Sequence, residues 1–152
     1  MLKTRDYVFV LWGDGFDETV ATIFVTELRE AGLLVKVVGL TPRQISGARG
    51  LALVPDLTLD QALPLAAQAI GLIIPAAAGQ SQWLNNDPRL GQFFEQASSN
   101  QARFVMGSRP EIGQAELELP ASVQGKVMVY PEAEGVMKFA RELAGLLLRQ
   151  GG

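Results

Sequence analysis

Hydrophobic residues along the chain form two kinds of pattern, short continuous runs and runs with helical spacing. The first continuous run, YVFVLW at residues 7–12, is rich in β-branched and aromatic side chains and is typical of a strand buried on both faces. Over residues 17–31 the apolar positions recur at steps of three and four, which predicts an amphipathic helix. Asp14 or Asp17 can cap this helix, and Gly32 ends it.

The pattern next predicts a parallel pair of strands. Residues 34–40 form a second apolar run, and a strand, a helix and a strand joined by tight connections make a βαβ unit. Residues 41–54, punctuated by one proline and two glycines, predict a small hairpin. A modest helix follows over residues 59–69, and Pro64 within it favours a break into two short turns.

The second half of the chain continues the alternation. Strands are predicted at residues 70–74, 103–106 and 126–130, and helices from Pro88, with Asp87 as the N-cap, and over residues 132–149. This order predicts an α/β fold, a three-layer sandwich whose mostly parallel sheet has the five-strand flavodoxin-like order. Ligands of such sheets bind beyond the carboxyl ends of the strands. That edge is formed by the loops at residues 13–17, 75–82, 107–110 and 130–134.

Length and composition limit the partners of this chain. The 152 residues carry 13 basic and 16 acidic side chains, a net charge of -3, so no basic surface favours nucleic acid or an anionic membrane as a partner. The longest apolar stretch, residues 69–78, is well short of the roughly 20 residues that a membrane-spanning helix needs. The first residues lack the apolar core and cleavage site of a signal peptide. We expect a single domain over residues 1–152 and a cytoplasmic location.

The chain contains neither cysteine nor histidine. This excludes disulfides, thiolate nucleophiles, cysteine or imidazole metal ligands and every catalytic triad that contains histidine. Ser81 and Ser108 are the hydroxyls best placed for nucleophilic chemistry, but no histidine or neighbouring lysine can activate them. A backbone hydrogen bond is the expected role of each. Trp83 is expected to pack against the fold, with the floor of a pocket or an interface as alternatives.

The turn after the first predicted strand, GDG at residues 13–15, has features of two kinds of site. Glycines before a helix N-terminus can bind phosphate, but Glu18 replaces the third glycine of the G-x-G-x-x-G motif, and the acids Asp14, Asp17 and Glu18 would repel a pyrophosphate. The same three carboxylates are weak candidates for a Mg²⁺ site, because this ion prefers oxygen ligands. We expect a turn and a helix cap here, with no cofactor and no bound metal.

Two segments resemble the ThiJ/PfpI superfamily, whose proteins are class I glutamine amidotransferase-like. The segments are GFDETVATIFVTELREAGLLVKVVGL at residues 15–40 and GLALVPDLTLDQAL at residues 50–63. Members of the superfamily open with G-F-E-E-x-E before a helix that ends in L-R-x-A-G, then a strand and a hairpin that ends in V-x-P-D. The likeness covers the first 75 residues and continues weakly to Gly107. It implies a flavodoxin-like sandwich and a homodimer, often formed through the first helix.

The resemblance also implies where the chemistry of the family would lie. Its enzymes use a cysteine on a strained turn between a strand and a helix, a glutamate on the first helix and often a histidine. Alignment without gaps places Val20 at the glutamate and Gly107 at the cysteine, with Met106 next if the alignment shifts by one residue. Ala76 and Ala77 replace the glycine pair whose N–H groups would bind an oxyanion. The resemblance thus implies that the catalytic groups have been replaced.

The segment beyond Gly107 also departs from the family. Residues 107–126 are typical of a loop, with weak helix signals at residues 111–118, where the family has a helix that follows the nucleophile turn. Glycine adopts such a turn without the strain, of order 1 to 3 kcal/mol, that a nucleophile held there carries.

These replacements lead to three hypotheses about function. The one we favour is a non-catalytic member of the family with a binding, regulatory or scaffolding role. The second is a hydrolase or glyoxalase-like enzyme with a rebuilt site that uses Glu18 with Ser108 or a bound water. The third is a sensor that binds a small apolar ligand in the vestigial pocket, which is lined by Val20, Ala76, Ala77 and Gly107.

Overall fold

Six strands form one sheet in the computed structural model, which describes residues 6–40, 45–76, 87–107, 123 and 126–150. Their order across the sheet is β5-β2-β1-β6-β7-β8, and each neighbouring pair is parallel. In chain order the strands are β1 (Tyr7–Trp12), β2 (Leu34–Gly39), β5 (Leu57–Thr58), β6 (Ala69–Ile74), β7 (Arg103–Met106) and β8 (Met128–Val129). The predicted α/β fold with a mostly parallel, flavodoxin-like sheet is confirmed.

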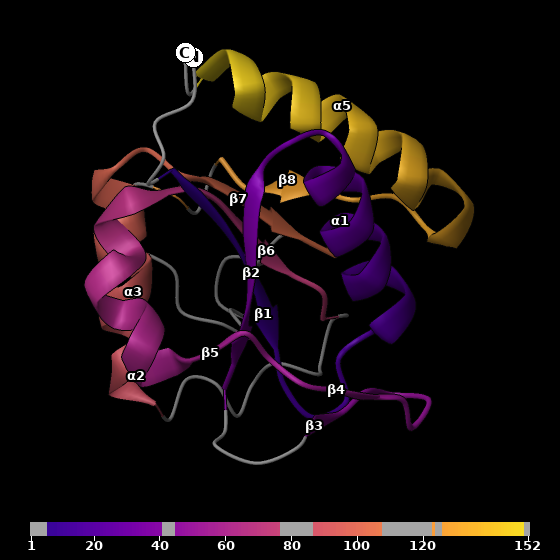
Figure 1. Cartoon of the computed structure of the whole chain (residues 1–152), viewed down its shortest axis with the longest axis horizontal. Coiled ribbons are helices and arrows are strands. Elements are labelled where there is room, and N and C mark those ends of the chain that lie inside the picture. Colours follow the sequence, from indigo (N-terminus) through magenta and orange to yellow (C-terminus); the bar gives the residue numbers. More distant parts are fainter. Residues whose placement is uncertain (1–5, 41–44, 77–86, 108–122, 124–125, 151–152) are drawn as a thin grey trace.

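Helices cover both faces of this sheet (Figure 1). On one face α1 (Glu18–Glu30) packs beside α5 (Val136–Gln150), which follows the 3-10 turn η3 (Ala133–Gly135). On the other face lie α2 (Leu59–Ala62), the 3-10 helix η1 (Leu63–Gln68) and α3 (Pro88–Ser99). The sheet is therefore the middle layer of a three-layer sandwich. No helix within the described ranges has the length and apolar character needed to cross a membrane.

The hydrophobic pattern accounts for the central layer and for the limits of α1. The last five residues of β1 are fully buried, because helices on both faces exclude water from this strand. At the start of α1, Asp17 Oδ1 accepts a hydrogen bond from the Val20 N–H at 3.1 Å, so Asp17 rather than Asp14 is the cap. Beyond the end of α1, Gly32 has a φ of 95°, a left-handed conformation that glycine adopts without strain.

Three further predictions from the pattern are confirmed. Pro64 lies in η1, where the helical segment changes from α2 into a 3-10 helix. The Asp87 side chain caps α3 by accepting the Arg89 N–H at 3.0 Å. The predicted hairpin consists of β3 (Ile45–Ser46) and β4 (Ala52–Leu53), which pair antiparallel.

The prediction of five strands is wrong by one, because β5 adds a strand at the edge of the sheet. β5 pairs with Val38 and Gly39 of β2. Two residues are too few to show the alternation of a strand, so the pattern gives no signal for β5. Its position is fixed by the preceding Asp56, whose carboxylate accepts the Val37 N–H at 2.8 Å.

Two boundaries near the C-terminal end are also corrected. The last strand is shorter than the predicted residues 126–130, since only Met128 and Val129 pair with β7. The closing α-helix begins at Val136 rather than at residue 132, because the chain first makes the tighter turn of η3.

The contact between α5 and β6 predicts a difference between two neighbouring leucines. Leu147 is fully buried, and its Cδ1 would lie 3.3 Å from a β-carbon placed on Gly71 of β6. We expect Leu147→Ala to lower the free energy of unfolding by about 2–5 kcal/mol. Leu148→Ala is the matched control, because Leu148 is 37% exposed and its loss should cost less than about 1 kcal/mol. Urea denaturation followed by circular dichroism measures both, and equal losses would contradict this packing.

Candidate functional site

The carboxyl edge of the sheet brings together residues that follow four of its strands. β1 leads through a turn to Asp17, β6 leads to Pro75, β7 to Gly107 and β8 to Tyr130. Backbone hydrogen bonds join these segments. The Asp17 N–H donates to the Pro75 carbonyl oxygen at 2.8 Å, and the Tyr130 N–H donates to the Met106 carbonyl oxygen at 3.0 Å. We refer to these segments as the carboxyl-edge site.

Tyr130 occupies the space beside Gly107 in this site. Its ring packs edge-on against Phe24 of α1, with centroids 5.8 Å apart. A β-carbon added to Gly107 would lie 2.8 Å from Tyr130 Oη, closer than such carbons approach other atoms, and 3.1 Å from the Ala76 carbonyl oxygen, which is a tight contact. Gly107 therefore allows the phenol to lie against the end of β7, and a side chain at this position would displace Tyr130.

The environment of Tyr130 keeps its hydroxyl protonated. Burial, and to a smaller extent the negative charge of Asp17, raise the pKa of Tyr130 to about 12. At neutral pH the phenol is therefore neutral. A neutral phenol is a hydrogen-bond donor and acceptor, and it is a poor general base or nucleophile.

The other residues aligned with the catalytic positions lie in packed parts of this edge. Val20 is buried in the first turn of α1 and belongs to the hydrophobic core. Met106 ends β7 and pairs with Ile74 on one side and Val129 on the other. Ala76 is buried after β6, and its carbonyl oxygen faces Gly107. These positions thus contribute apolar packing and backbone groups to the carboxyl-edge site.

Glu18 is a buried carboxylate whose partners are backbone amides of the hairpin. It is 5% exposed, and its Oε2 accepts the Arg49 N–H at 2.9 Å and the Leu51 N–H at 3.1 Å. Gly47 makes this approach possible, because a β-carbon there would lie 2.7 Å from the Glu18 carboxyl carbon. Glu18 therefore fastens the hairpin to the start of α1.

These contacts also set the ionisation of Glu18. Burial raises the pKa of the carboxyl, but backbone hydrogen bonds from Glu18 itself, Leu51 and Arg49, together with the Arg49 charge, outweigh burial and lower the pKa below the ordinary value of 4.5. Glu18 is thus ionised at neutral pH, and its lone pairs are engaged by the hairpin amides.

Of the three acids proposed as weak metal candidates, one is exposed and the other two share a counter-charge. Asp14 is exposed in the turn after β1, whereas Asp17 caps α1 and lies 3.3 Å from Arg49 Nη1. The same guanidinium lies 3.5 Å from Glu18 Oε1. Among the described residues there is no cluster of three acidic, histidine or cysteine side chains that could hold a metal ion.

Several predicted residues lie outside the described residues. They are Ala77, Ser81, Trp83 and Ser108, together with the weak helix signal at residues 111–118. The structure therefore places Val20, Ala76, Met106 and Gly107 at one edge of the sheet, and the pairing of Glu18 with Ser108 stays a prediction.

Sequence reasoning assigns no role to Tyr130 or to Gly47. Residues 130–134 belong to the predicted carboxyl edge, so a large aromatic residue directly after the last strand was a usable signal for Tyr130. The requirement for glycine at position 47 had no such signal, because it arises from Glu18, which is distant in the sequence.

Comparison with protein families shows the family to which this chain belongs. Residues 6–107, which are more than half of the chain, match the model of the DJ-1/PfpI family. The chain belongs to the DJ-1/PfpI family. This confirms the resemblance to the ThiJ/PfpI superfamily. In this DJ-1/PfpI chain, Gly107 is the last matched residue, and Tyr130 lies beyond the matched region.

Solved structures share the fold of this DJ-1/PfpI chain. Drosophila melanogaster DJ-1beta is 18% identical with a TM-score of 0.75, and the match covers 97% of this chain and 91% of that chain. A cysteine-to-alanine mutant of a DJ-1 superfamily protein from Salmonella typhimurium is 19% identical with a TM-score of 0.72, and the match covers 95% of this chain and 91% of that chain. The VC2308 protein is 23% identical with a TM-score of 0.60 over 70% of this chain, which spans about half, 52%, of that protein. Comparison with curated proteins finds no match.

The hairpin contact predicts a pH-dependent role for Glu18. Because the pKa is lower in the folded than in the unfolded chain, the carboxylate stabilises the fold above the unfolded value near 4.5, and this contribution is lost as the pH falls through the lower folded value. We expect Glu18→Gln to lower the melting temperature by about 5 °C or more at pH 7, because the neutral amide loses the charge that strengthens the hydrogen bonds from the hairpin N–H groups and attracts Arg49.

The melting temperatures of the wild type and of Glu18→Gln, measured between pH 7 and pH 3, check this prediction. The difference between them should shrink below pH 4.5. Glu30→Gln, a substitution at an exposed position of the same helix, is the control and should change little. A difference that stays constant down to pH 3 would show that the Glu18 charge is not what stabilises the hairpin.

The contact of Gly107 with Tyr130 predicts coupling between the two positions. Gly107→Ala should cost about 1–3 kcal/mol of unfolding free energy, because the added carbon overlaps the phenol. In a Tyr130→Ala background the same substitution should cost at least about 1 kcal/mol less. Gly91→Ala is the control, since no atom outside its own helix lies within 4 Å of the added carbon, and it should be neutral or stabilising. Urea denaturation of the four proteins of the cycle and of the control measures the coupling; additive costs would contradict the contact.

Proposed function

We propose that this chain is a non-catalytic DJ-1/PfpI domain with a binding, regulatory or scaffolding role. The observation that carries this proposal is the Tyr130 phenol, which lies where a side chain on residue 107 would project. A nucleophilic side chain at position 107 would need the space that the Tyr130 phenol occupies, so the two cannot be present together in this arrangement. Gly107 is also the residue that alignment places at the cysteine of the family's enzymes.

The chemistry of the neighbouring groups supports the same proposal. The chain has no cysteine and no histidine, and Val20 offers no proton-transfer group at the position of the family glutamate. The Tyr130 phenol is neutral at physiological pH, and the Glu18 carboxylate is held by hairpin amides. The side chains described at this edge therefore supply packing and hydrogen bonds rather than a nucleophile and a base.

Two alternatives differ from this proposal in what they require. The rebuilt enzyme requires Glu18 to leave the hairpin amides and to act on Ser108 or a bound water. The sensor requires space for an apolar ligand beside Val20, Ala76 and Gly107, whereas the Tyr130 ring takes up the space next to Gly107. Each alternative therefore requires a contact of the structure to be broken, the Glu18 hydrogen bonds in the first case and the packing of Tyr130 beside Gly107 in the second. For this reason we favour the non-catalytic role. The homodimer implied by the resemblance and the cytoplasmic location expected from the sequence pattern remain part of this proposal.

Activity assays test the proposal. The purified chain is incubated with a 2-oxoaldehyde and, separately, with an unfolded protein substrate, with a cysteine-containing DJ-1/PfpI enzyme assayed in parallel. We expect no turnover above the uncatalysed rate with either substrate. Ser108→Ala and Tyr130→Phe are assayed alongside the wild type. Turnover that either single substitution abolishes would show that the chain has an active site of its own and would overturn the proposal.

A further inference from the structure

The outer edge of β2 is only partly covered by β5. β5 pairs with Val38 and Gly39 at the end of β2, and no strand within the described ranges pairs with the outer edge of residues 34–37. An uncovered edge presents backbone N–H and C=O groups to which a further strand can hydrogen-bond. The first part of β2 is therefore a place where a second chain could extend the sheet.

Alternation along β2 shows which backbone groups face this outer edge. The Leu40 N–H donates to the Trp12 carbonyl oxygen of β1 at 3.0 Å, so the backbone groups of Leu40 point inward. In an extended strand the N–H and C=O of one residue point to the same side, and successive residues alternate between the two sides. The backbone groups of Val35 and Val37 therefore point outward, away from β1.

Two charged side chains occupy these outward groups. The Asp56 carboxylate accepts the Val37 N–H at 2.8 Å, and the Asp56 N–H donates to the Val37 carbonyl oxygen at 2.9 Å. Arg29 of α1 donates from Nη2 to the Val35 carbonyl oxygen at 2.9 Å. The same Nη2 lies 2.8 Å from Asp56 Oδ2, so the two side chains form an ion pair over the edge. We call Arg29 and Asp56 the edge clasp.

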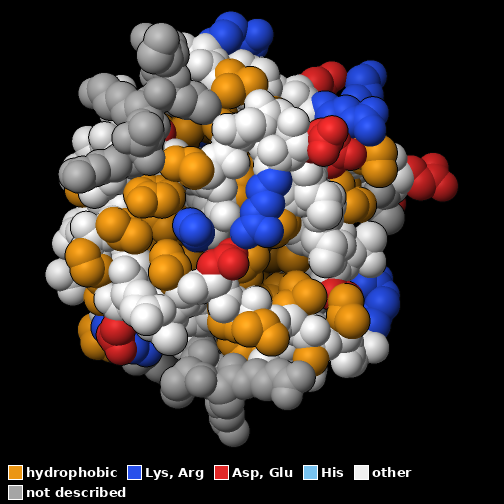
Figure 2. All heavy atoms as spheres, viewed as in Figure 1, with side chains coloured by type: hydrophobic (Ala, Val, Ile, Leu, Met, Phe, Trp, Pro, Cys, Tyr) orange, Lys and Arg blue, Asp and Glu red, His pale blue; other side chains and the backbone are white. Residues whose placement is uncertain are grey.

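The sequence of β2 favours pairing with a further strand. LVKVVG, residues 34–39, is rich in β-branched side chains and contains one charge and no proline, as is typical of segments that add to sheets. Leu34 at its start is 41% exposed. The face seen in Figure 2 includes this edge, and a few acidic and basic side chains lie there among hydrophobic ones. The edge clasp therefore covers a strand whose own side chains do little to prevent pairing.

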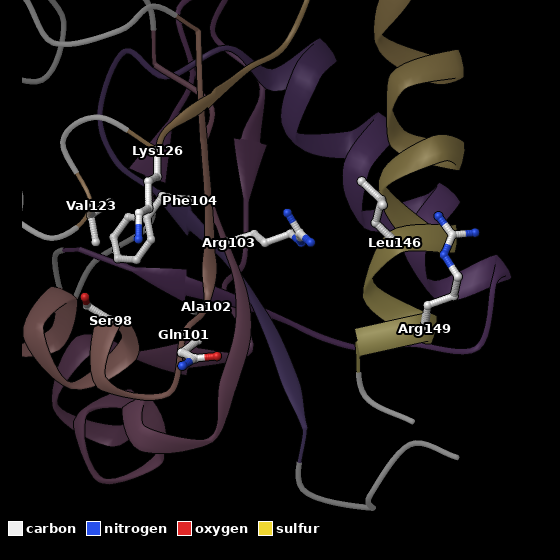
Figure 3. A pocket seen from close by; sticks show the side chains of 9 residues that line it. All are labelled: Ser98, Gln101, Ala102, Arg103, Phe104, Val123, Lys126, Leu146 and Arg149. Atoms are coloured by element: carbon white, nitrogen blue, oxygen red, sulfur yellow. The ribbon is translucent and has the colours of Figure 1, made fainter.

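Other outer parts of the sheet lack such a clasp. β8, the opposite outer strand, pairs over only Met128 and Val129, and a strand this short offers little to a second chain. A pocket of about 810 Å³ lies at the start of β7, where Figure 3 shows Arg103 and Arg149 on one side of the strand and Lys126 on the other. The described residues that line this pocket include no acid, so they form no pair of opposite charges over a strand.

We propose that the edge clasp prevents a second copy of this chain from adding its own β2 edge to the sheet. An incoming strand would have to displace Arg29 from the Val35 carbonyl and Asp56 from the Val37 N–H. A second copy is the partner that fits, because its β2 has the same length and sequence, and two such edges can pair antiparallel about a twofold axis. This inference goes beyond the proposed function, since the groups involved are separate from the carboxyl-edge site.

Sedimentation velocity of the double variant Arg29→Ala, Asp56→Ala tests the proposal. The two substitutions remove one positive and one negative charge, so the net charge stays at -3. We expect the average mass to rise with concentration to at least about twice that of the wild type, because the freed groups pair with those of a second copy. The wild type at the same concentration is the reference, so a homodimer present in both proteins does not count. A mass equal to that of the wild type at every concentration would overturn the proposal.

The double variant Glu27→Ala, Arg141→Ala is the matched control. It also removes one ion pair without changing the net charge, but this pair joins α1 to α5, with 3.1 Å between Arg141 Nε and Glu27 Oε2. Its mass should equal that of the wild type. An equal rise in this control would show that loss of any surface ion pair causes association, which is contrary to the proposal.

A charge placed on the edge shows whether the association uses β2. Leu34→Lys, added to the Arg29→Ala, Asp56→Ala variant, should return the mass to the wild-type value, because like charges oppose the pairing of two identical edges. Leu148→Lys in the same background is the control, since Leu148 is 37% exposed but lies on α5, and it should leave the association unchanged. Reversal by both substitutions, or by neither, would contradict pairing through β2.

Circular dichroism and melting temperature confirm that each variant is folded. If the double variant does not fold, Arg29→Ala alone decides, because it frees the Val35 carbonyl and leaves Asp56 on Val37. Its mass should still exceed that of the wild type, and an unchanged mass would overturn the proposal. None of these results bears on the turnover assays.

Discussion

Lack of space beside two glycines determines how the carboxyl edge of the sheet is built. At Gly47 an added β-carbon would lie 2.7 Å from the Glu18 carboxyl carbon, and at Gly107 it would lie 2.8 Å from the Tyr130 hydroxyl. In both places glycine lets a polar side chain come against the main chain of another segment. Because packed interiors have few voids to absorb an added methyl group, the residues on either side of each contact depend on one another. The hairpin, the start of α1 and the ends of β7 and β8 are therefore fixed in relation to the same edge.

The two acidic contacts at the start of α1 show how charge supports this arrangement. Asp17 satisfies a free N–H of the helix and Glu18 satisfies two of the hairpin, so both carboxylates are used for backbone groups that would otherwise lack partners. Arg49 lies 3.3 Å from one and 3.5 Å from the other. Asp17 and Glu18, which follow the glycine turn, therefore stabilise the fold, because each of them binds backbone N–H groups and lies beside the positive charge of Arg49.

Much of the fold could be predicted because many of its elements are determined by residues that are close together in the sequence. A fully apolar run such as β1, the cap at Asp17 and the break at Pro64 each depend on a few neighbouring residues, and each was found in the expected place. β5 was missed because its pairing with β2 depends on Asp56 reaching across to Val37 rather than on its own two residues. The alignment located Gly107 at the end of β7. It gave no information on Tyr130, because the neighbours that give this residue its role are far away in the sequence.

The contact between Tyr130 and Gly107 constrains the order in which the chain can change over evolutionary time. A residue larger than glycine at position 107 is tolerated only after position 130 has lost its phenol or moved it aside. A smaller residue at position 130, in turn, exposes Phe24 to an unfilled space. Each first step is thus costly on its own, although the two together can be compatible. In descendants of this chain, position 107 should remain glycine for as long as position 130 remains aromatic.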